Sequence, residues 1–172
     1  MVLAGDLGGT NFRAALVDPS GKILSLVSER IPAHPTPRIL VPLMRRVLEL
    51  ARAGSRRRPD SFALSAKGLV DPERGLLKTV SEFRDWKDVP LTALLGRALG
   101  LPGRLENDAK SAALGEGWVG CARGFRDYAF VIVGTGVGTG IVQGGRLLRG
   151  AHGHAGELGH MVVDASNPEL VC

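Results

Sequence analysis

Two glycine-rich segments, set far apart in the sequence, constrain the fold of this 172-residue chain more than any other feature. The first is Asp6-Leu7-Gly8-Gly9-Thr10-Asn11, and the second is Gly134-Thr135-Gly136-Val137-Gly138-Thr139-Gly140. Short apolar runs, typical of strands, stand on both sides of each segment. Glycine lets the backbone approach a ligand closely and point its amide groups at an anion. The pattern predicts two lobes that each begin with a strand, a turn able to hold phosphate and a returning strand.

The spacing of apolar residues predicts a mixed α/β chain that opens with an antiparallel meander. We expect strands at Val2–Gly5, Phe12–Val17, Ile23–Ile31, Ser61–Ser65, Arg104–Glu106, Tyr128–Val133 and Thr139–Gln143, and a last strand beginning at Leu147. Helices are expected from Pro37 to a glycine cap at Gly54, from Leu91 to Leu99, and from Asn107 through an alanine-rich segment. Residues 66–89 are expected to form a long functional loop.

The order of these elements predicts where the two lobes divide. Residues 1–120 would form the first lobe, and Gly120–Gly124 would be a linker. Residues 125–172 begin like the first lobe but contain no predicted helix. We therefore expect the second lobe to be incomplete, with apolar strands left unburied.

The composition and the sequence pattern disfavour several classes of protein. The net charge is +5, but aromatic residues are only 5% of the chain, which disfavours nucleic-acid binding. Two cysteines are too few for a disulfide framework. The sequence has no signal-peptide pattern and no apolar run of the ~18 residues that a membrane span needs. These features predict a soluble cytoplasmic protein that binds neither nucleic acid nor membrane.

Asp108 is the candidate catalytic residue. It stands at the expected start of a helix, where the helix dipole keeps a carboxylate ionised. A carboxylate there could cap the helix, or could accept the proton of a hydroxyl that attacks a phosphoryl group. Asn107 could likewise cap the helix or hold a neighbouring hydroxyl. Glu116, further along the helix, is more typical of an exposed or supporting group.

The two turns are candidate phosphate sites. In the first turn the candidate ligands are Gly8, Gly9, Thr10 and Asn11, with Asp6 placed to hold Mg²⁺ directly or through water. In the second turn they are Gly134, Thr135, Gly136 and Gly138. The second turn matches neither the dinucleotide fingerprint nor the P-loop. Either turn alone could be an ordinary hairpin, so the prediction depends on their occurring together.

A histidine-rich loop near the end of the sequence contains His152, His154, Glu157 and His160. Glu157 and His160 are three residues apart and could both hydrogen-bond to sugar hydroxyls. The order of these residues is not that of the His-Glu-x-x-His zinc pattern. His160 and Cys172 could begin a zinc site, although two ligands do not complete one. For His152 and His154 a structural loop is the simpler interpretation.

Together these segments resemble the ROK family, a group of repressors and sugar kinases that includes bacterial glucokinases. Asp6–Asn11 and Gly134–Gly140 resemble its two phosphate motifs, and Glu106–Glu116 resembles its catalytic segment. Ala155–His160 is similar to its sugar-binding signature. The resemblance implies an actin-like, ribonuclease-H-like fold whose two lobes close on a hexose and ATP.

The resemblance also implies a role for each candidate residue. Asp108 would be the catalytic base, and Asn107, Asp108, Glu157 and His160 would bind the sugar. The two glycine turns would hold the phosphates of ATP, with Mg²⁺. His160 would in addition ligate a structural Zn²⁺, with Cys172 as the first cysteine of a cysteine-rich zinc motif. Full-length members are expected to be homodimers.

Three departures from the family pattern affect these expectations. Ser65-Ala66-Lys67-Gly68 stands where the family has Gly-x-Pro-Gly, and Ser81–Trp86 replaces an asparagine-rich loop before a tryptophan. The other zinc cysteines, a further sugar-binding glutamate and most of the nucleotide-binding lobe are not in the sequence. We therefore expect a truncated form of the family.

The predicted function is ATP-dependent phosphorylation of a hexose at its C6 hydroxyl, converting glucose to glucose 6-phosphate. One alternative is a sugar-binding remnant without catalysis. Another is a sugar-responsive transcriptional regulator without its DNA-binding domain, which would have to precede Asp6. N-acetylmannosamine, fructose or allose as substrate, and polyphosphate as donor, stay open.

Overall fold

The computed structural model describes residues 1–81, 83, 85–134, 136–162, 164 and 166. They form two compact units, Met1–Asp108 and Ala109–Cys172, which are described separately. No helix among the described residues is long and apolar enough to cross a membrane. The division of the chain near Gly120 that the sequence suggested stays a prediction about the complete protein.

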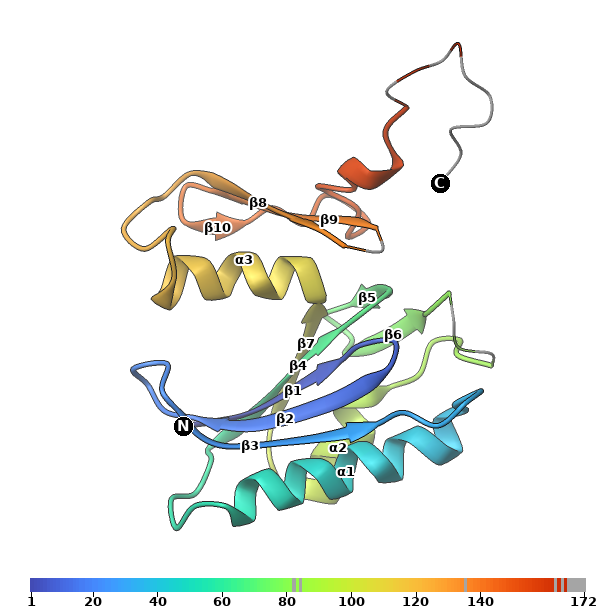
Figure 1. The fold of residues 1–172 in the computed structure, drawn as a ribbon, viewed down its shortest axis with the longest axis vertical. Helices are drawn as coiled ribbons and strands as arrows, with labels where there is room; N and C mark the ends of the chain where they lie inside the picture. Colours follow the sequence, from blue (N-terminus) through green and yellow to red (C-terminus); the bar gives the residue numbers. More distant parts are fainter. Residues whose placement is uncertain (82, 84, 135, 163, 165, 167–172) are drawn as a thin grey trace. The chain divides into compact units, whose positions relative to one another are not determined.

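The first unit is built on a five-stranded mixed sheet in the order β3-β2-β1-β4-β7 (Figure 1). Its strands are β1 (Val2–Leu7), β2 (Asn11–Val17), β3 (Ile23–Arg30), β4 (Ser61–Ala66) and β7 (Gly103–Asn107). The first three strands pair antiparallel, so the predicted meander is confirmed. β4 pairs parallel with β1, and β7 pairs parallel with β4.

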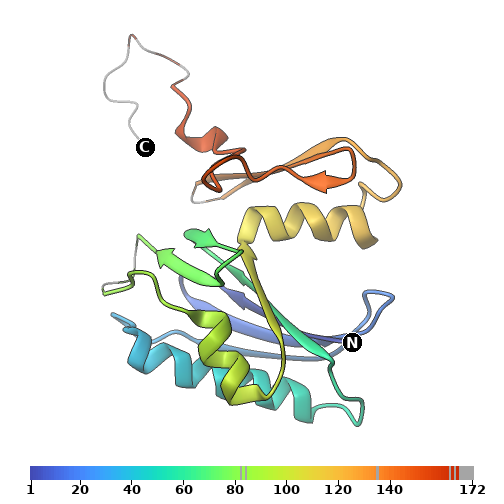
Figure 2. The same ribbon diagram turned by 180° about the vertical axis from the view of Figure 1, so that it is seen from behind.

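Two helices, α1 (Pro37–Ala53) and α2 (Leu91–Leu99), cover one face of this sheet (Figures 1 and 2). Side chains alternate across a strand, and along β1 and β4 every second residue is buried. The apolar stripe of α1 packs against that buried face. The largest fully buried side chains of this core include Leu3, Leu7, Phe12, Leu40, Met44, Leu48, Phe62, Leu91 and Leu95.

The expected loop at 66–89 contains a hairpin, so this prediction was wrong in part. Strand β5 (Leu69–Asp71) pairs antiparallel with β6 (Leu76–Thr79). Both strands are shorter than the average strand, and a polar turn separates them, so no periodic pattern marks them in the sequence. The hairpin contributes Val70 and Leu77 to the core of the first unit.

Gly54 ends α1 as predicted, but not as a left-handed cap. Its φ is −67°, and its N–H donates to the carbonyl oxygen of Leu50 at 3.1 Å. A Cβ at this position would lie 2.7 Å from Cβ of Ser25. Glycine is therefore needed here for close packing against β3. Gly100, which ends α2, does take the left-handed conformation, with φ of 66°.

The second unit packs the helix α3 (Asp108–Val119) on a three-stranded antiparallel sheet. The sheet has the order β10-β9-β8, with β8 (Tyr128–Val133), β9 (Val137–Gln143) and β10 (Arg146–Leu147). The helix begins at Asp108, one residue later than predicted, because Asn107 still pairs in β7. β9 begins two residues earlier than predicted, at Val137.

Small residues allow α3 and β9 to approach closely. A Cβ added to Gly138 would lie 2.9 Å from Cβ of Ala109, and one added to Gly140 would lie 2.4 Å from Cβ of Ala113. The Tyr128 hydroxyl donates to the carbonyl oxygen of Ala113 at 2.9 Å and fastens β8 to the same helix. The alanine-rich sequence of α3 is thus explained by the glycines that it faces.

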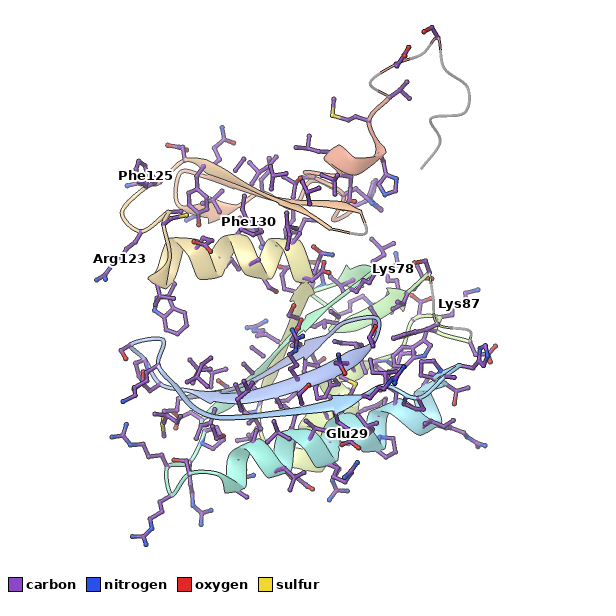
Figure 3. The ribbon with its side chains drawn as sticks, in the orientation of Figure 1. Glu29, Lys78, Lys87, Arg123, Phe125 and Phe130 are labelled. Atoms are coloured by element: carbon purple, nitrogen blue, oxygen red, sulfur yellow. The ribbon has the colours of Figure 1, made fainter. Side chains whose placement is uncertain are left out.

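The second unit leaves apolar side chains exposed, as the sequence predicted. Val131, Ile132 and Val133 of β8 are 49%, 50% and 76% exposed. Phe125, in the loop that precedes β8, is 66% exposed (Figure 3). An exposed apolar patch of this kind is typical of an interaction surface.

We expect Gly140→Ala to destabilise the chain by about 1–3 kcal/mol, because its Cβ would overpack the contact with α3. Gly136→Ala is the control, since a Cβ there would meet no atom within 4 Å. Urea unfolding followed by circular dichroism measures both variants. Equal midpoints for Gly140→Ala and Gly136→Ala would contradict the close approach of α3 to β9.

Candidate functional site

The candidate site of the first unit lies where three parallel strands end. Leu7 of β1 pairs with Ala66 of β4, and Ala66 pairs with Asn107 of β7, so these residues form one row across the sheet. In open α/β sheets, ligands bind beyond the carboxyl ends of the parallel strands. The turn after β1, the loop after β4 and the start of α3 all follow this row directly.

Asp6 stands one residue before the row. It pairs with Ser65 of β4 and with Arg13 of β2. Its Oδ1 accepts a hydrogen bond from the Ser65 hydroxyl at 3.2 Å, and its Oδ2 lies 3.9 Å from Nη1 of Arg13. The Asp6 side chain is 48% exposed. A partly exposed carboxylate at a strand end fits a Mg²⁺ ion that keeps several of its waters. The Mg²⁺ role of Asp6 stays a prediction.

The first glycine turn connects β1 and β2 and keeps its backbone uncovered. The Gly8 N–H donates to the carbonyl oxygen of Asn11 at 3.2 Å, and the Ile31 N–H donates to that of Thr10 at 2.8 Å. A Cβ at Gly9 would meet no atom within 4 Å. An open pocket of about 670 Å³ adjoins the turn, lined by Gly9, Thr10, Arg30, Ile31, Pro32, Ala33, His34, Pro35 and Phe83.

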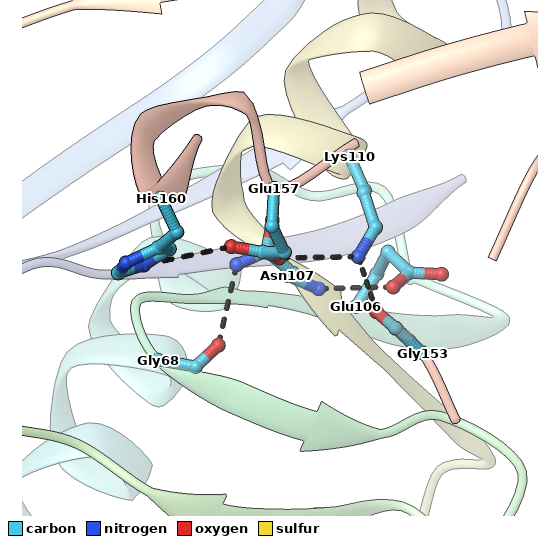
Figure 4. Close-up of polar contacts among 7 residues, drawn as sticks. All are labelled: Gly68, Glu106, Asn107, Lys110, Gly153, Glu157 and His160. Atoms are coloured by element: carbon cyan, nitrogen blue, oxygen red, sulfur yellow. Dashed lines mark hydrogen bonds and ion pairs between the residues drawn. The ribbon is translucent and has the colours of Figure 1, made fainter. Parts of the chain in front are cut away.

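Asn107 is fixed by the loop after β4 (Figure 4). Its Nδ2 donates to the carbonyl oxygen of Gly68 at 3.2 Å, and its backbone N–H donates to Oε1 of Glu106 at 3.1 Å. Gly68 has φ of 99°, and a Cβ there would lie 2.3 Å from the Thr79 carbonyl oxygen. The glycine is therefore required, and it holds a carbonyl group where the Asn107 amide can reach it.

Asp108 follows Asn107 as the first residue of α3. Helical N–H groups at this end of the helix lack partners within the helix, and the dipole favours a negative charge there. The role of Asp108 as the catalytic base stays a prediction. The structure brings Asn107 and Asp108 together through the junction between a strand and a helix.

In the second unit, Glu157 and His160 lie on one loop and face each other (Figure 4). Oε2 of Glu157 is 4.0 Å from Nε2 of His160, and both side chains are well exposed. Lys110 of α3 is the residue that the sequence analysis missed, with its Nζ 3.7 Å from Oε1 of Glu157. A single charge among the alanines of the helix was its only signal. His152 and His154 lie exposed on the same loop.

The second glycine turn connects β8 and β9. The Gly134 N–H donates to the carbonyl oxygen of Gly136 at 2.9 Å. Thr135, a predicted phosphate ligand, lies outside the described residues. Gly138 is needed for the contact with α3, so its presence has a structural cause beside the predicted phosphate role.

The zinc prediction stays a prediction. Among the described residues, no three His, Cys, Asp or Glu side chains are placed to share a metal ion. Cys172, the expected partner of His160, lies outside that part of the chain.

The loop that leads to Trp86 packs into the core of the first unit. Trp86 is buried, and its Nε1 donates to the carbonyl oxygen of Pro35 at 2.7 Å. Its ring packs on Phe83, with centroids 5.6 Å apart. Glu82 and Arg84 of this loop lie outside the described residues.

Glu116 accepts a hydrogen bond from the backbone just beyond the end of its own helix. Its Oε2 accepts a hydrogen bond from the Cys121 N–H at 2.8 Å, which lowers the pKa of the carboxyl. The same carboxylate raises the pKa of the Cys121 thiol, by accepting its hydrogen bond and by its negative charge. Glu116 thus has a local structural role, in agreement with the expectation.

We expect Glu116→Gln to make Cys121 more reactive. Loss of the carboxylate lowers the thiol pKa toward its ordinary value, so more thiolate is present at a given pH. The measurement is the pH dependence of alkylation by iodoacetamide in a Cys172→Ser background, where the midpoint should shift to lower pH. Glu49→Gln, an exposed charge on α1, is the control, and identical profiles for the two variants would refute the pairing.

Comparison with known proteins gives a consistent result. The model of the ROK family matches residues 2–172. The glucokinase of Thermotoga maritima is 35% identical over 168 residues, which are 97% of this chain and 52% of that protein. The chain spans about half the length of the curated relatives it matches.

Solved structures agree with this result. A ROK hexokinase from Thermus thermophilus is similar with a TM-score of 0.85 and 35% identity, over 97% of this chain and 55% of that one. A ROK family glucokinase from Streptomyces griseus, in complex with glucose and AMPPNP, has a TM-score of 0.80 and 34% identity, over 95% and 51%. A ROK family transcriptional regulator has a TM-score of 0.84 and 28% identity, over 96% and 42%. The similar sugar kinases have the actin-like ATPase fold, and the predicted fold class is confirmed.

Proposed function

Since the chain belongs to the ROK family, we propose that it acts in the ATP-dependent phosphorylation of a hexose at C6, with glucose as the substrate. The observation that carries the proposal is the junction of β7 and α3, where Asn107 and Asp108 follow one another at the end of the parallel strands. The similarity to glucokinases, one of them in complex with glucose and AMPPNP, supports the choice of substrate and donor.

In the proposed reaction, Asp108 accepts the proton of the C6 hydroxyl. The C6 oxygen then attacks the γ-phosphorus of ATP in line, and the bond from that phosphorus to the β,γ-bridging oxygen breaks, releasing ADP. The dipole at a helix N-terminus favours a negative charge, which is the form of a carboxylate that accepts this proton. General-base help of this kind accelerates a reaction by about 10²–10⁴-fold.

The other predicted residues would hold the reactants. Asn107, Glu157 and His160 are proposed to bind hexose hydroxyls. Glycine turns at Gly8–Gly9 and Gly134–Gly136 are proposed to hold phosphate oxygens with backbone N–H groups, which stabilise charge without reorganising. Asp6 would hold Mg²⁺, which neutralises charge on the phosphates when bound.

We expect Asp108→Asn to abolish phosphorylation, with a loss of about 10²–10⁴-fold in kcat, because the amide accepts no proton at neutral pH. Hexose affinity should fall much less than kcat, since the substitution keeps the shape of the side chain and the amide oxygen still accepts a hydrogen bond from the hydroxyl. A coupled assay of ADP release with glucose and ATP measures the rate, and calorimetry measures glucose binding. Glu49→Gln is the matched control for loss of one carboxylate.

Sugar binding without catalysis is the second candidate function. It is favoured by Gly138, whose close contact with α3 gives this glycine of the second turn a structural cause beside the predicted phosphate role. Calorimetry separates the two candidates, because a binding remnant would take up glucose but neither bind ATP nor release ADP. A chain that binds no hexose would contradict both.

A further inference from the structure

Lys110 is the buried charged residue of the catalytic helix. Its side chain is 3% exposed, although it lies in the first turn of α3, two residues after Asp108. Lysine is almost never fully buried unless its charge is paired, because an ammonium group taken out of water loses a large hydration energy. The charge of a lysine buried at this position must therefore be compensated by polar or charged groups close to its ammonium group.

Two polar partners of its ammonium group lie on the loop that carries the predicted sugar ligands. The ammonium group donates to the carbonyl oxygen of Gly153 and lies 3.7 Å from Oε1 of Glu157 (Figure 4). The other oxygen of Glu157 faces Nε2 of His160 at 4.0 Å. Lys110, Glu157 and His160 thus form a row of charged and polar groups, buried at the lysine and exposed at the histidine.

Within the part of the chain that the structure describes, few other side-chain contacts hold Glu157 in place. Gly150, Gly153 and Gly156 all have positive φ, so the loop turns sharply and repeatedly. Apolar anchoring is weak, since Leu158, beside Glu157, is 41% exposed. The loop touches β9 mainly through backbone, where a Cβ at Gly159 would lie 2.5 Å from the Val137 carbonyl oxygen. These backbone contacts fix the position of the loop, but they do not fix the orientation of the Glu157 carboxylate.

We propose that Lys110 is a positioning residue, which ties α3 to the loop at 150–160 and orients the Glu157 carboxylate for a hexose hydroxyl. The proposal rests on the proposed function, in which Glu157 is a sugar ligand. With one oxygen turned to the lysine, the carboxylate is restricted in orientation, so its other oxygen is ready to accept a hydrogen bond from a hexose hydroxyl. Lys110 itself does not touch the hexose.

The expected effect is on binding more than on chemistry. Without the ammonium group, the Glu157 carboxylate loses its cationic neighbour and must be ordered by the hexose itself. We expect Lys110→Met to raise the hexose Kd and KM roughly tenfold, while kcat falls much less. Asp108→Asn should show the reverse pattern, so the two variants separate positioning from proton transfer.

A double-mutant cycle on glucose binding tests the proposal. Calorimetry compares the wild type, Lys110→Met, Glu157→Gln and the double variant, with Lys22→Met as the control for loss of an exposed lysine. If Lys110 acts through Glu157, the double variant binds glucose no more weakly than Glu157→Gln alone. Fully additive losses, or an unchanged Kd for Lys110→Met, would overturn the proposal.

Hydrogen exchange of the free chain gives a readout that needs no hexose. Amides at 153–160 should exchange faster in Lys110→Met and in Glu157→Gln, which breaks the same pair from the exposed side and should leave folding intact. Unchanged exchange in Glu157→Gln overturns the proposal, even where Lys110→Met does not fold. If the wild type binds no glucose, the proposed function fails and the role in hexose binding fails with it, while faster exchange still establishes the tether.

Discussion

The in-register parallel pairing of β1, β4 and β7 is the constraint on which the candidate site depends. Because Leu7, Ala66 and Asn107 share one row, the segments that follow them leave the sheet at the same edge. At that edge lie the first glycine turn, the carbonyl group of Gly68 and the start of α3. A shift of one residue in the pairing of β4 with β7 would turn Asn107 to the other face of the sheet and break its hydrogen bond to Gly68.

Within the second unit, α3 makes two unlike kinds of interaction. Along its length, alanines meet glycines of β9 at distances that exclude larger side chains. In its first turn, a buried lysine meets a carbonyl group and a carboxylate. Close packing sets the distance of the helix from the sheet, whereas the charge selects the conformation of one loop. Such a division of roles is expected, because packing is nondirectional and ion pairs depend on geometry.

The sequence was sufficient for the strands of the main sheet, since buried positions alternate in β1 and β4, and turn or helix patterns separate the five strands. It was insufficient for the β5–β6 hairpin, whose strands are too short to show a period. Gly54 and Gly138 were assigned from local rules, but their neighbours Ser25 and Ala109 are distant in sequence. Lys110 was missed for the same reason, because its partners lie more than 40 residues away. Residues that act within one turn or motif were predictable, and residues defined by packing between segments were not.

The central claim, that residues of the sugar signature and of the catalytic segment bind one hexose, is tested most directly by NMR. Glucose would be titrated into the ¹⁵N-labelled chain while backbone and asparagine side-chain amides are followed. The account predicts saturable shifts at Gly68, at Asn107 and its side-chain amide, and at Gly153–His160, with one common Kd. Amides of α1 should not respond. Absence of saturable shifts at these positions, or shifts confined to other segments, would contradict the account.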